Sequence, residues 1–537
     1  MAAPEAAAGS VVVLGNGPVG QTAALLLARW GVGVVLLDAR PGRDAIGSKA
    51  ICQQRDVLDV WEAVGAGRRI ADEGLTWTTA RTFYRDRELF AYTLPGERGG
   101  SCFPPFVNIS QARAEQILDE AIAREPRIDV RWQHRIVGLR QDPRRVVVSC
   151  ETPRGMVEIE AAYALACTGA RADDVREMLG VGFDGHSFDD RFLICDIRAD
   201  LPGWGRERRF YFDPAWNPGR QVLIHLCPDS TFRIDWQVPG DYDLAAEEAS
   251  GALASRIRAV VGERPYEIVW RSVYRIHSRV VDRMRVGRVL LAGDCAHLMS
   301  PFGARGLNSG VADAENAAWK LAYVRQGWAG DGLLESYHQE RHAAALENLE
   351  VTTATMQFLV PRDEAQRRRR VDVLTRAVSD PTARGEVDSG RFAEPFWYVD
   401  SPLTTPDPSR PFAGRPERGT TPRPGPGILV PDAPIALADS SHRRLREIAR
   451  DGFLLLAASG VDGAVTGAAA ESARGPVRVL PLEKVGMSGA LANALASRPG
   501  EVWVIRPDAH VAAVLTSPGG ADVAAALRRA RGFPASP

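Results

Sequence analysis

Paired cysteines are missing from this sequence. Its 537 residues contain seven cysteines, which are scattered and form no CxxC motif, so a zinc site built on cysteine pairs is excluded. The nine histidines show no metal-ligand spacing, and neither a GxSxG nor an HExxH motif occurs. We therefore expect reduced thiols and no bound metal. The cysteines are Cys52, Cys102, Cys150, Cys167, Cys195, Cys227 and Cys295.

Long apolar runs and an excess of one charge are missing as well. No segment approaches the roughly 18 apolar residues of a membrane-spanning helix, and the first ten residues lack the features of a signal peptide. Lys and Arg (66) nearly balance Asp and Glu (67), whereas nucleic-acid-binding proteins are usually strongly basic. We expect a cytoplasmic enzyme that acts on a small molecule and binds neither nucleic acid nor membrane.

The pattern along the chain predicts an α/β protein with several domains. Apolar runs at 11–14 and 34–37, separated by a helical stretch, are typical of a buried parallel sheet. Aromatic-rich segments between 183 and 280 predict a second, antiparallel sheet. Prolines crowd the stretch 401–427, which predicts a linker before a smaller α/β unit at 428–537.

A glycine-rich turn follows the first apolar run. Gly15 permits a tight turn, Gly17 lets the backbone approach a pyrophosphate, and Gly20 allows close packing of helix on strand. Pro18 stands in the same turn, and the helix that follows offers free N–H groups to phosphates. Asp38 ends the second apolar run, where a carboxylate accepts hydrogen bonds from a ribose. The arrangement predicts a dinucleotide site.

A second motif at 293–310 reads GDCAHLMSPFGARGLNSG and follows the apolar run 288–292. The order GxGxxG, then Gln111 on a helix, then GDxxHxxxPxGxxGxN resembles the class A flavin-dependent monooxygenases. This is the family of para-hydroxybenzoate hydroxylase and phenol hydroxylase. The string PFGARGLNSGVADAENAAWKLA is most similar to the 3-(3-hydroxyphenyl)propionate hydroxylases. The resemblance covers about residues 10–355.

The resemblance implies FAD as the cofactor. Asp294 would bind the ribityl chain, Pro301 and Gly303 would lie against the isoalloxazine, and the helix near Asn308 would direct its N-terminus at the flavin. Lys49 stands where the family carries a phosphate-binding Arg. The residues expected at the cofactor are Gly15, Gly17, Pro18, Gly20, Asp38, Arg40, Lys49, Gln111, Gly293, Asp294, Pro301, Gly303, Gly306, Leu307 and Asn308.

One family motif is altered in this chain. Relatives carry a string such as CDGARSxVR, whose Asp is linked to FAD and NAD(P)H binding, whereas residues 167–176 read CTGARADDVR. Thr168 therefore replaces the Asp and carries no charge. This departure leaves open a protein that binds FAD without oxidising NAD(P)H.

On the substrate side, the strands that carry His225 and Arg233 resemble the sheet above the ring pocket of hydroxybenzoate hydroxylase. Alternation places Arg233, Asp235 and Gln237 on one face. We expect Arg233 to hold a substrate carboxylate or the flavin, and His225 and Tyr211 to bind or deprotonate a phenol. A solvent-facing polar face is the alternative. The candidate catalytic residues are His225, Arg233, Tyr211 and Pro301, with Tyr274 and His277 as further candidates.

The resemblance implies an FAD-dependent monooxygenase that consumes NAD(P)H and O2 and hydroxylates a phenolic ring through a C4a-hydroperoxyflavin. A phenolic acid such as 3-(3-hydroxyphenyl)propionate and a natural-product phenol are both compatible with it. The alternatives are Baeyer–Villiger oxygenation, epoxidation or dehalogenation by a related flavoprotein, or a non-catalytic FAD-binding protein. The choice between NADH and NADPH stays open.

The resemblance also predicts the architecture. A Rossmann-like FAD-binding domain would carry an inserted antiparallel-sheet substrate domain, followed by a C-terminal thioredoxin-like domain. No cysteine follows Cys295, so the last domain lacks dithiol chemistry and is interpreted as a packing or dimerisation module, with a homodimer as one expectation. The predicted boundaries are 1–182 and 281–400 for the two parts of the FAD-binding domain, 183–280 for the substrate domain, 401–427 for the linker and 428–537 for the thioredoxin-like domain.

Overall fold

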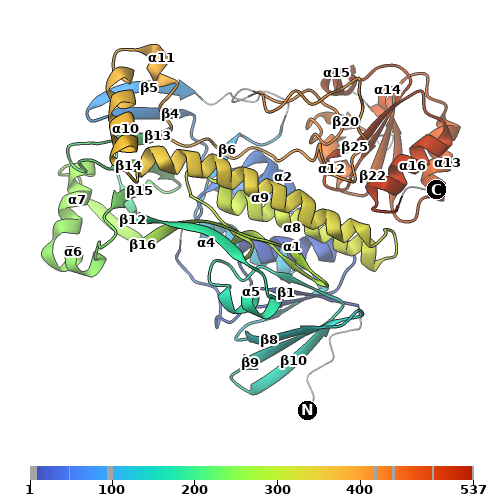
Figure 1. The fold of residues 1–537 in the computed structure, drawn as a ribbon, viewed down its shortest axis with the longest axis horizontal. Coiled ribbons are helices and arrows are strands. Elements are labelled where there is room, and N and C mark those ends of the chain that lie inside the picture. Colours follow the sequence, from blue (N-terminus) through green and yellow to red (C-terminus); the bar gives the residue numbers. More distant parts are fainter. Residues whose placement is uncertain are drawn as a thin grey trace.

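The computed structural model describes residues 9–47, 49–93, 101–416, 420–437, 442–485 and 489–534. Two large sheets, a pair of long helices and a C-terminal α/β unit make up the molecule (Figure 1). An eight-stranded sheet lies at one end and the C-terminal unit at the other, with the helices α8 and α9 running between them (Figure 1). Among the described residues, no helix has both the length and the apolar composition needed to cross a membrane.

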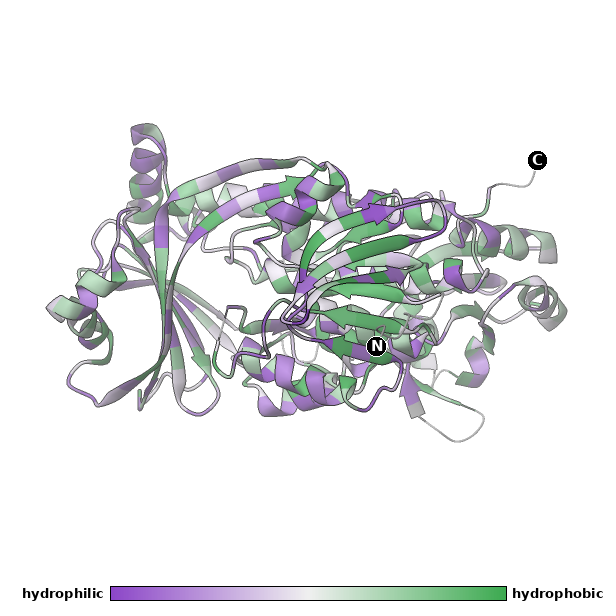
Figure 2. Cartoon of the chain, turned by 90° about the horizontal axis from the view of Figure 1, so that it is seen from below, coloured by the Kyte–Doolittle hydropathy of each residue, from purple (hydrophilic) through white to green (hydrophobic). Residues whose placement is uncertain are grey.

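A six-stranded sheet holds the glycine-rich turn. Its order is β17-β18-β11-β1-β2-β7, and all neighbours except β17 and β18 pair in parallel. The apolar strands near the N-terminus are mostly green in Figure 2, because their side chains are buried in one core with those of α1 and of residues 146–161. The elements are β1 (Val11–Leu14), α1 (Pro18–Arg29), β2 (Val34–Leu37), α4 (Gln111–Ile122), β7 (Ile128–Arg131), β11 (Tyr163–Ala166), α5 (Asp173–Leu179), β17 (Arg285–Val286) and β18 (Val289–Leu291).

Smaller elements surround this sheet. The strands β3 and β6 pair with each other, and β8, β9 and β10 form an antiparallel sheet of three strands. The elements are β3 (Cys52–Gln54), α2 (Arg55–Glu62), α3 (Gly67–Glu73), β6 (Phe106–Asn108), β8 (Arg135–Gln141), β9 (Val146–Thr152), β10 (Gly155–Ala161), η1 (Gly293–Cys295) and β19 (His297–Leu298).

The eight-stranded sheet has the order β19-β16-β12-β15-β14-β13-β4-β5. Two of its strands, β4 and β5, come from residues 79–93, so the predicted range 183–280 is too narrow for this sheet. β4 pairs in parallel with β13, far along the chain, and strand patterns reveal no such long crossover. The elements are β4 (Thr79–Tyr84), β5 (Arg87–Thr93), β12 (Phe183–Ala199), β13 (Glu207–Phe212), β14 (Gln221–Cys227), β15 (Thr231–Val238), α6 (Leu244–Ser250), α7 (Ala252–Val261) and β16 (Tyr266–Val281).

The two faces of this sheet have different partners. The outer face carries Ile234 and Trp236, which pack against Ile257 of α7. The inner face carries Phe192 and Phe210 and packs against the long helices and the loop 300–304. Because cross-strand pairs share a face, the inner face also holds the side chains of Arg208, His225, Arg233, Asp235 and Gln237.

Four helices follow the second motif. α8 begins at Arg305, a turn earlier than the expected Asn308, because Ala304 adopts a left-handed conformation (φ 57°) that starts the helix there. α1 packs against α8, which packs against α9, so the helices bring the two motifs together. The elements are α8 (Arg305–Arg325), α9 (Gly332–Leu359), α10 (Glu364–Ala377) and α11 (Pro381–Arg384).

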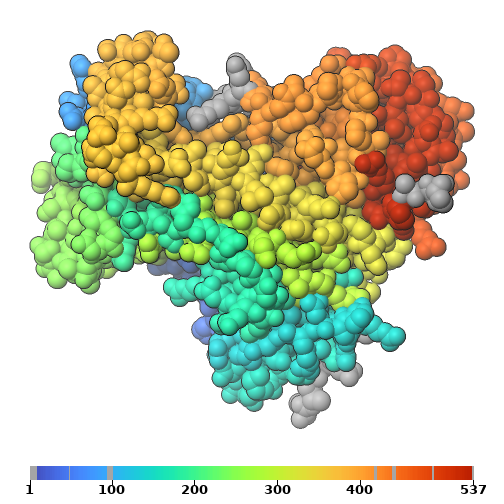
Figure 3. Space-filling model, viewed as in Figure 1, coloured from blue at the N-terminus to red at the C-terminus, as the bar shows by residue number. Residues whose placement is uncertain are grey.

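The proline-rich segment 401–427 is not a free linker. Its Arg410 is buried and donates to both carboxylate oxygens of Glu501, at 2.7 and 2.9 Å. Backbone hydrogen bonds also tie Thr405 to Ala512 at 2.7 Å. In Figure 3 the orange segment lies on the surface between the yellow long helices and the red C-terminal unit. Proline content predicted a linker but not the packing that one buried arginine provides.

The C-terminal unit contains a four-stranded sheet with the order β23-β22-β24-β25. β22 and β23 are parallel, whereas β22, β24 and β25 pair antiparallel. Arg506 of this unit donates to Glu340 of α9 at 2.6 and 3.0 Å, within a buried contact. The elements are β20 (Pro434–Ala436), β21 (His442–Arg444), α12 (Leu445–Ala449), β22 (Phe453–Ala457), α13 (Gly463–Ser472), β23 (Val477–Pro481), α14 (Leu482–Val485), α15 (Ala490–Leu495), β24 (Glu501–Ile505), β25 (Val511–Thr516) and α16 (Gly520–Ala530).

Candidate functional site

The glycine-rich turn leaves open space only at its middle glycine. A Cβ at Gly15 would lie 2.4 Å from the carbonyl oxygen of Cys167, and one at Gly20 would lie 1.9 Å from that of Gly15. A Cβ at Gly17 would meet nothing within 4 Å, although Gly17 caps the N-terminus of α1 and Pro18 begins the helix. The turn therefore presents an open helix N-terminus, which is the geometry that binds a pyrophosphate.

Asp38 is held rigidly at the end of β2. Its carboxylate accepts hydrogen bonds from the backbone N of Asn16 (2.9 Å) and of Arg40 (2.9 Å), and from the Arg40 guanidinium (3.0 Å). Burial would raise the pKa of Asp38, but the hydrogen bonds from Arg40 and Asn16 outweigh it and the pKa is lowered. Arg40 thus positions an ionised acceptor beside the turn.

The carboxylate of Asp294 has no side-chain partner among the described residues. The residue is exposed, yet the surrounding protein raises the pKa of its carboxyl. Lys49 and Arg176 lie close enough to counteract that rise in pKa. Its carboxylate makes no hydrogen bond with any residue that the structure describes, and an orphan acceptor of this kind fits a polyhydroxyl chain.

The loop that carries Lys49 is fixed by Gln111. The side-chain oxygen of Gln111 accepts from the backbone N of Ala50 (3.0 Å), and its Nε2 donates to Glu115 (2.8 Å). The backbone oxygen of Lys49 also accepts from Arg233 (3.3 Å). Gln111 thus positions the Lys49 loop, and its expected contact with the cofactor stays a prediction.

The altered motif packs directly on the Gly293–Asp294 turn. Thr168 lies 3.4 Å (Oγ1) from the Sγ of Cys295. Buried Arg176, the last residue of the motif, donates to the carbonyl oxygens of Cys295 (3.0 Å) and Asp294 (3.1 Å). Sequence reasoning missed Arg176, although its place in the family string was a signal.

A buried network also supports the Gly293 turn from beneath. Asp313 of α8 accepts from the backbone N of Gly293 (2.9 Å), from Nε of Arg341 (2.6 Å) and bonds Nε2 of His297 (2.7 Å). Burial opposes ionisation, but Arg341 and His297 bring the pKa of Asp313 down to about 2. Asp313 and Arg341 were also missed. Neither residue was marked by its local sequence, since Glu315 and Asn316 are further polar positions in the same stretch of α8.

The loop 300–304 approaches the segment 391–393 so closely that a side chain is excluded at Gly303. Gly303 has φ 95°, and a Cβ there would lie 2.0 Å from the carbonyl oxygen of Arg391. Its own oxygen accepts from Ala393 (2.7 Å). Pro301 precedes this turn, and Phe302 inserts into the inner face of the eight-stranded sheet.

Asn308 connects α8 to the strand β3. Its amide donates to the carbonyl oxygen of Cys52 (3.0 Å) and accepts from the backbone N of Gln54 (2.9 Å). Asn308 therefore positions α8. Gly306 and Leu307 lie in the first turn of the helix, where N–H groups have no intrahelical acceptor, and a Cβ at Gly306 would meet nothing within 4 Å.

Arg233 and His225 lie side by side on the inner face, but their surroundings differ from those expected of free substrate-binding groups. Arg233 donates to both carboxylate oxygens of Asp196, at 2.9 and 3.3 Å, so it is not a free binder of a substrate carboxylate. Burial, reinforced by Arg208 and Arg233, lowers the pKa of His225 well below its ordinary value. The imidazole is therefore held in its neutral form, and its expected contact with a phenol stays a prediction.

Tyr211 is not brought to this site. It stacks on Phe83 at 4.6 Å between ring centroids and contacts Trp216, on the outer face of the sheet. Its neighbour Phe210 points inward, because successive side chains of a strand alternate. The sequence predicts that side chains alternate along this strand, but it does not show which of the two faces points inward.

Further polar residues mark the far end of the inner face. Gln237 donates to Asp190 (2.5 Å) and accepts from the backbone N of Gln221 (3.2 Å). There a cavity of about 750 Å³ opens beside α10 and is lined in part by Tyr84, Gln237 and Arg370. His277 pairs with Ser187 (2.7 Å), and Tyr274 packs against Phe192 on the inner face.

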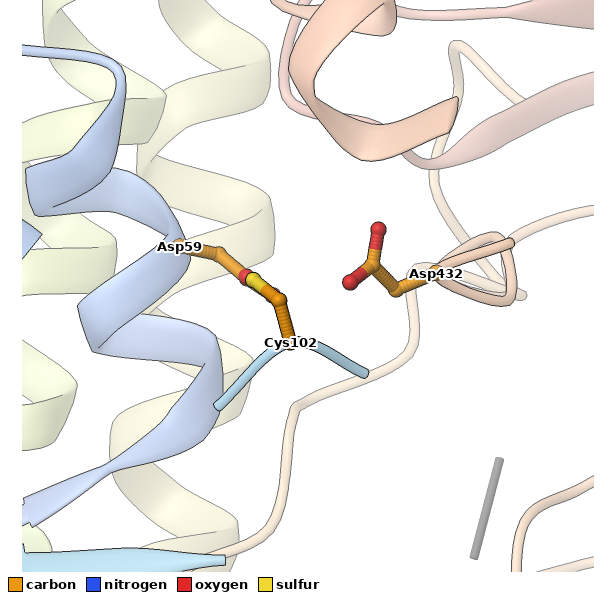
Figure 4. Close-up of side chains that lie close together, drawn as sticks. All are labelled: Asp59, Cys102 and Asp432. Atoms are coloured by element: carbon orange, nitrogen blue, oxygen red, sulfur yellow. The ribbon is translucent and has the colours of Figure 1, made fainter. Parts of the chain in front are cut away.

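A cluster of Asp59, Cys102 and Asp432 lies between α2 and the C-terminal unit (Figure 4). Their ligand atoms are within 4.8 Å of one another. However, Asp59 accepts from Arg446 (2.8 Å) and Asp432 from Arg444 (2.5 Å), so guanidinium groups already balance both carboxylates. Burial, together with both carboxylates, raises the pKa of the Cys102 thiol to about 11, which opposes a thiolate ligand. We interpret the cluster as a polar contact between the two units.

Comparison with known proteins fits this geometry. The family described as "FAD binding domain" matches residues 9–352. A 3-(3-hydroxy-phenyl)propionate/3-hydroxycinnamic acid hydroxylase of Mycobacterium sp. (strain KMS) is 28% identical over 453 residues, 83% of this chain and 74% of that protein. A flavin-dependent monooxygenase of Mycobacteroides abscessus is 30% identical over 408 residues, 71% and 82% of the two chains.

The crystal structure of the flavin-dependent monooxygenase PieE with FAD and substrate superposes with a TM-score of 0.82. It is 21% identical and covers 97% of this chain and 98% of PieE, which establishes the shared fold. The chain belongs to the FAD-binding-domain family. The open helix start at Gly17 and the orphan carboxylate of Asp294 fit that cofactor. More particularly, the protein is an FAD-dependent monooxygenase that uses NAD(P)H and O2.

Proposed function

We propose that the protein hydroxylates a phenolic aromatic substrate in the space between the inner face and the loop 300–304. One observation carries the proposal: Phe302 of this loop packs edge-on against Phe192 at 5.4 Å and against Phe210 at 6.0 Å. The loop of the cofactor motif and the polar residues of the inner face therefore border the same region. Relatives named for hydroxylation of phenolic acids support the choice of substrate.

Bound FAD would supply a site for hydride from NAD(P)H and for activation of O2. The residues of this chain hold it in place. The N-terminus of α1 would bind the pyrophosphate, Asp38 the ribose and Asp294 the ribityl chain, with Lys49 near the negative charges. The first turn of α8, at Gly306, would direct its positive end at the ring.

We assign positioning roles to Arg233 and acceptor chemistry to His225. Arg233 links Asp196 on the sheet to the backbone of Lys49, so it couples the substrate face to the cofactor loop. His225 is buried and neutral, and its Nδ1 has no hydrogen-bond partner among the described residues. It is therefore suited to accept or donate a hydrogen bond to a substrate oxygen rather than to carry a charge.

We infer the finer architecture from element order. The sequence β22-α13-β23-α14-α15-β24-β25-α16, with β22 central beside a parallel and an antiparallel neighbour, supports a thioredoxin-like C-terminal domain. No described cysteine lies in it, so we propose that it packs against the long helices and offers a surface for a homodimer. The eight-stranded sheet, with 79–93 included, would be the substrate domain.

Stopped-flow reduction tests this function. The FAD-loaded protein is mixed anaerobically with NADH or NADPH, with and without phenolic acids. We expect flavin reduction to accelerate when a fitting phenol is bound, because the substrate completes the site. A flavin that stays oxidised under every condition would refute the oxygenase function and favour the non-catalytic alternative raised by Thr168.

A further inference from the structure

Arg208 is a buried cation whose side chain makes no hydrogen bond or ion pair with any described residue. It is 3% exposed and lies on the inner face next to His225, with the rings of Phe210 and Phe392 near its guanidinium. Its Nε is enclosed without an acceptor. A guanidinium in this position is among the least favourable groups in a protein interior unless an anion joins it. The arrangement indicates that the anion arrives with a ligand.

Asp235 is the matching anion on the same face. Its carboxylate makes no hydrogen bond within the described residues, and Oδ1 is enclosed without a donor. Asp235 and Tyr274, both on the inner face, keep partial exposure, so the surrounding protein does not seal them from a ligand. Arg208 and Asp235 influence each other electrostatically but do not form an ion pair.

The register sets Arg208 and Asp235 diagonally apart on the inner face. Arg208 of β13 lies across from His225 of β14 and Arg233 of β15, and Asp235 is two residues further along β15, which sets the backbones of Arg208 and Asp235 about 12 Å apart. Aromatic rings flank the Arg208 end, where its guanidinium lies 5.1 Å from Phe392, and Phe392 lies 5.3 Å from Trp77. The loop 300–304 borders the same region, since Ala393 bonds Gly303.

We propose that Arg208 and Asp235 bind the two ends of one substrate, a phenol that carries a second, anionic group such as a carboxylate. This inference rests on the proposed hydroxylase function. Arg208 binds the anionic group, and Asp235 accepts the hydroxyl proton. In that step the phenol O–H bond breaks, an O–H bond forms on the carboxylate of Asp235, and the electron pair stays on the phenolate oxygen. The ring becomes more electron-rich at the carbons that receive oxygen.

The surroundings of Asp235 suit a base that works near neutral pH. Burial, together with Asp196, raises the pKa of Asp235 to about 7, although Arg233 and Arg208 act in the opposite direction. Its carboxyl is therefore able to take a proton above pH 7 and is blocked below it. The charged and titratable groups that face it are Arg233 on its own strand, Arg208 on β13, His225 on β14, Asp196 on β12 and Tyr274 on β16.

Two variants of the FAD-loaded protein separate the two ends of the site. The probes are 3-(3-hydroxyphenyl)propionate and its amide, which differ in one charge, and binding is read from the flavin absorbance. We expect the wild type to bind the acid at least about tenfold more tightly than the amide, since a buried charge pair is lost with the amide. Arg208→Gln should abolish this preference, and Arg208→Lys should restore part of it. Equal affinities for acid and amide in the wild type would overturn the assignment of Arg208.

Asp235→Asn tests the other end. It should keep the preference for the acid and still oxidise NAD(P)H, but hydroxylated product should fall about 10²- to 10⁴-fold and peroxide should appear instead. The rise of kcat/KM through pH 7 should also disappear. Asp189→Asn, at an exposed residue of β12, is the matched control and should behave as wild type.

The outcomes distinguish this inference from the proposed function. A wild type that hydroxylates no phenol contradicts the function itself. A wild type that hydroxylates phenols, combined with an Asp235→Asn variant that makes product at the normal rate, overturns only the role of Asp235. An Arg208→Gln variant that alters FAD affinity while keeping the preference for the acid would assign Arg208 to the cofactor instead.

Discussion

Alanine substitutions at two glycines of the first turn should have opposite effects on the folded protein. A Cβ at Gly20 would lie 1.9 Å from the carbonyl oxygen of Gly15, whereas ordinary contact needs about 3.4 Å. The start of α1 would have to retreat from β1 by more than an ångström. We expect Gly20→Ala to lower the free energy of unfolding by roughly 3 kcal/mol, the upper end for overpacked interiors. The loss is large because the new methyl group would clash with backbone atoms, which cannot move aside as a side chain can.

Gly17→Ala should leave the apoprotein intact. Gly17 has φ −93° and ψ −177°, which any residue adopts, and its Cβ would meet nothing within 4 Å. Alanine has fewer backbone conformations than glycine in the unfolded chain, so less entropy is lost on folding. This should stabilise the apoprotein by about 0.4–1 kcal/mol. In the loaded protein, however, the methyl group would stand where the pyrophosphate approaches. Loss of one charged hydrogen bond, roughly 1.5–3 kcal/mol, would weaken FAD binding about 10- to 150-fold.

Thermal unfolding of FAD-free protein and titration with FAD, followed by flavin fluorescence, measure the two effects separately. We expect Gly20→Ala to unfold at a lower temperature and also to bind FAD weakly. We expect Gly17→Ala to unfold normally and to bind FAD weakly. If Gly17→Ala binds FAD as tightly as the wild type, the open space at the start of α1 is not the pyrophosphate site. The assignment of this turn to the cofactor would then be wrong.

Three further predictions concern charged groups. Asp294→Ala should purify without bound FAD, because the unpartnered carboxylate assigned to the ribityl chain is removed; a fully yellow variant would contradict the assignment. Asp313, whose pKa is lowered to about 2, should add about 2 kcal/mol of stability that is complete above pH 4 and is lost as the pH falls toward 2. Asp313→Asn should flatten this part of the acid unfolding curve, and an unchanged curve would disprove the network. Glu340→Gln removes the buried carboxylate that Lys320 and Arg506 share; Arg506 keeps Asp508, but Lys320 is left buried without a carboxylate, which should lower stability by about 3–5 kcal/mol, measured by thermal unfolding. A change below about 1 kcal/mol would show that this contact does not anchor the C-terminal unit.

Motifs with local geometric demands could be predicted from the sequence. Gly15 and Gly20 lie where no side chain fits, and Gly303 requires a positive φ. The need for glycine at these positions is therefore visible in the composition and spacing of the sequence. Asp38 and Asp294 stand at fixed offsets from apolar strands. These residues form the cofactor half of the candidate site because a turn between a strand and a helix is encoded within a few positions.

The substrate half depends on pairing between distant strands. Tyr211 and Arg208 lie three residues apart on one strand, yet on opposite faces of the sheet, and only the packing of Phe210 shows which face is inward. Arg233 looked free in the sequence but pairs with Asp196, 37 residues away. The pKa of His225 depends on two arginines that tertiary structure brings to it. Such features follow from register and burial, which local pattern does not specify.

The measurement that tests the central claim most directly is oxygen incorporation. The FAD-loaded protein is supplied with NAD(P)H, ¹⁸O2 and an anionic phenol such as 3-(3-hydroxyphenyl)propionate. The mass of the product is then measured by mass spectrometry. A flavin monooxygenase that acts on the ring predicts one ¹⁸O atom in a new hydroxyl group, with the remaining oxygen released as water. Oxidation of NAD(P)H that yields only labelled peroxide with every phenol offered, or a product without ¹⁸O, would contradict hydroxylation at this site.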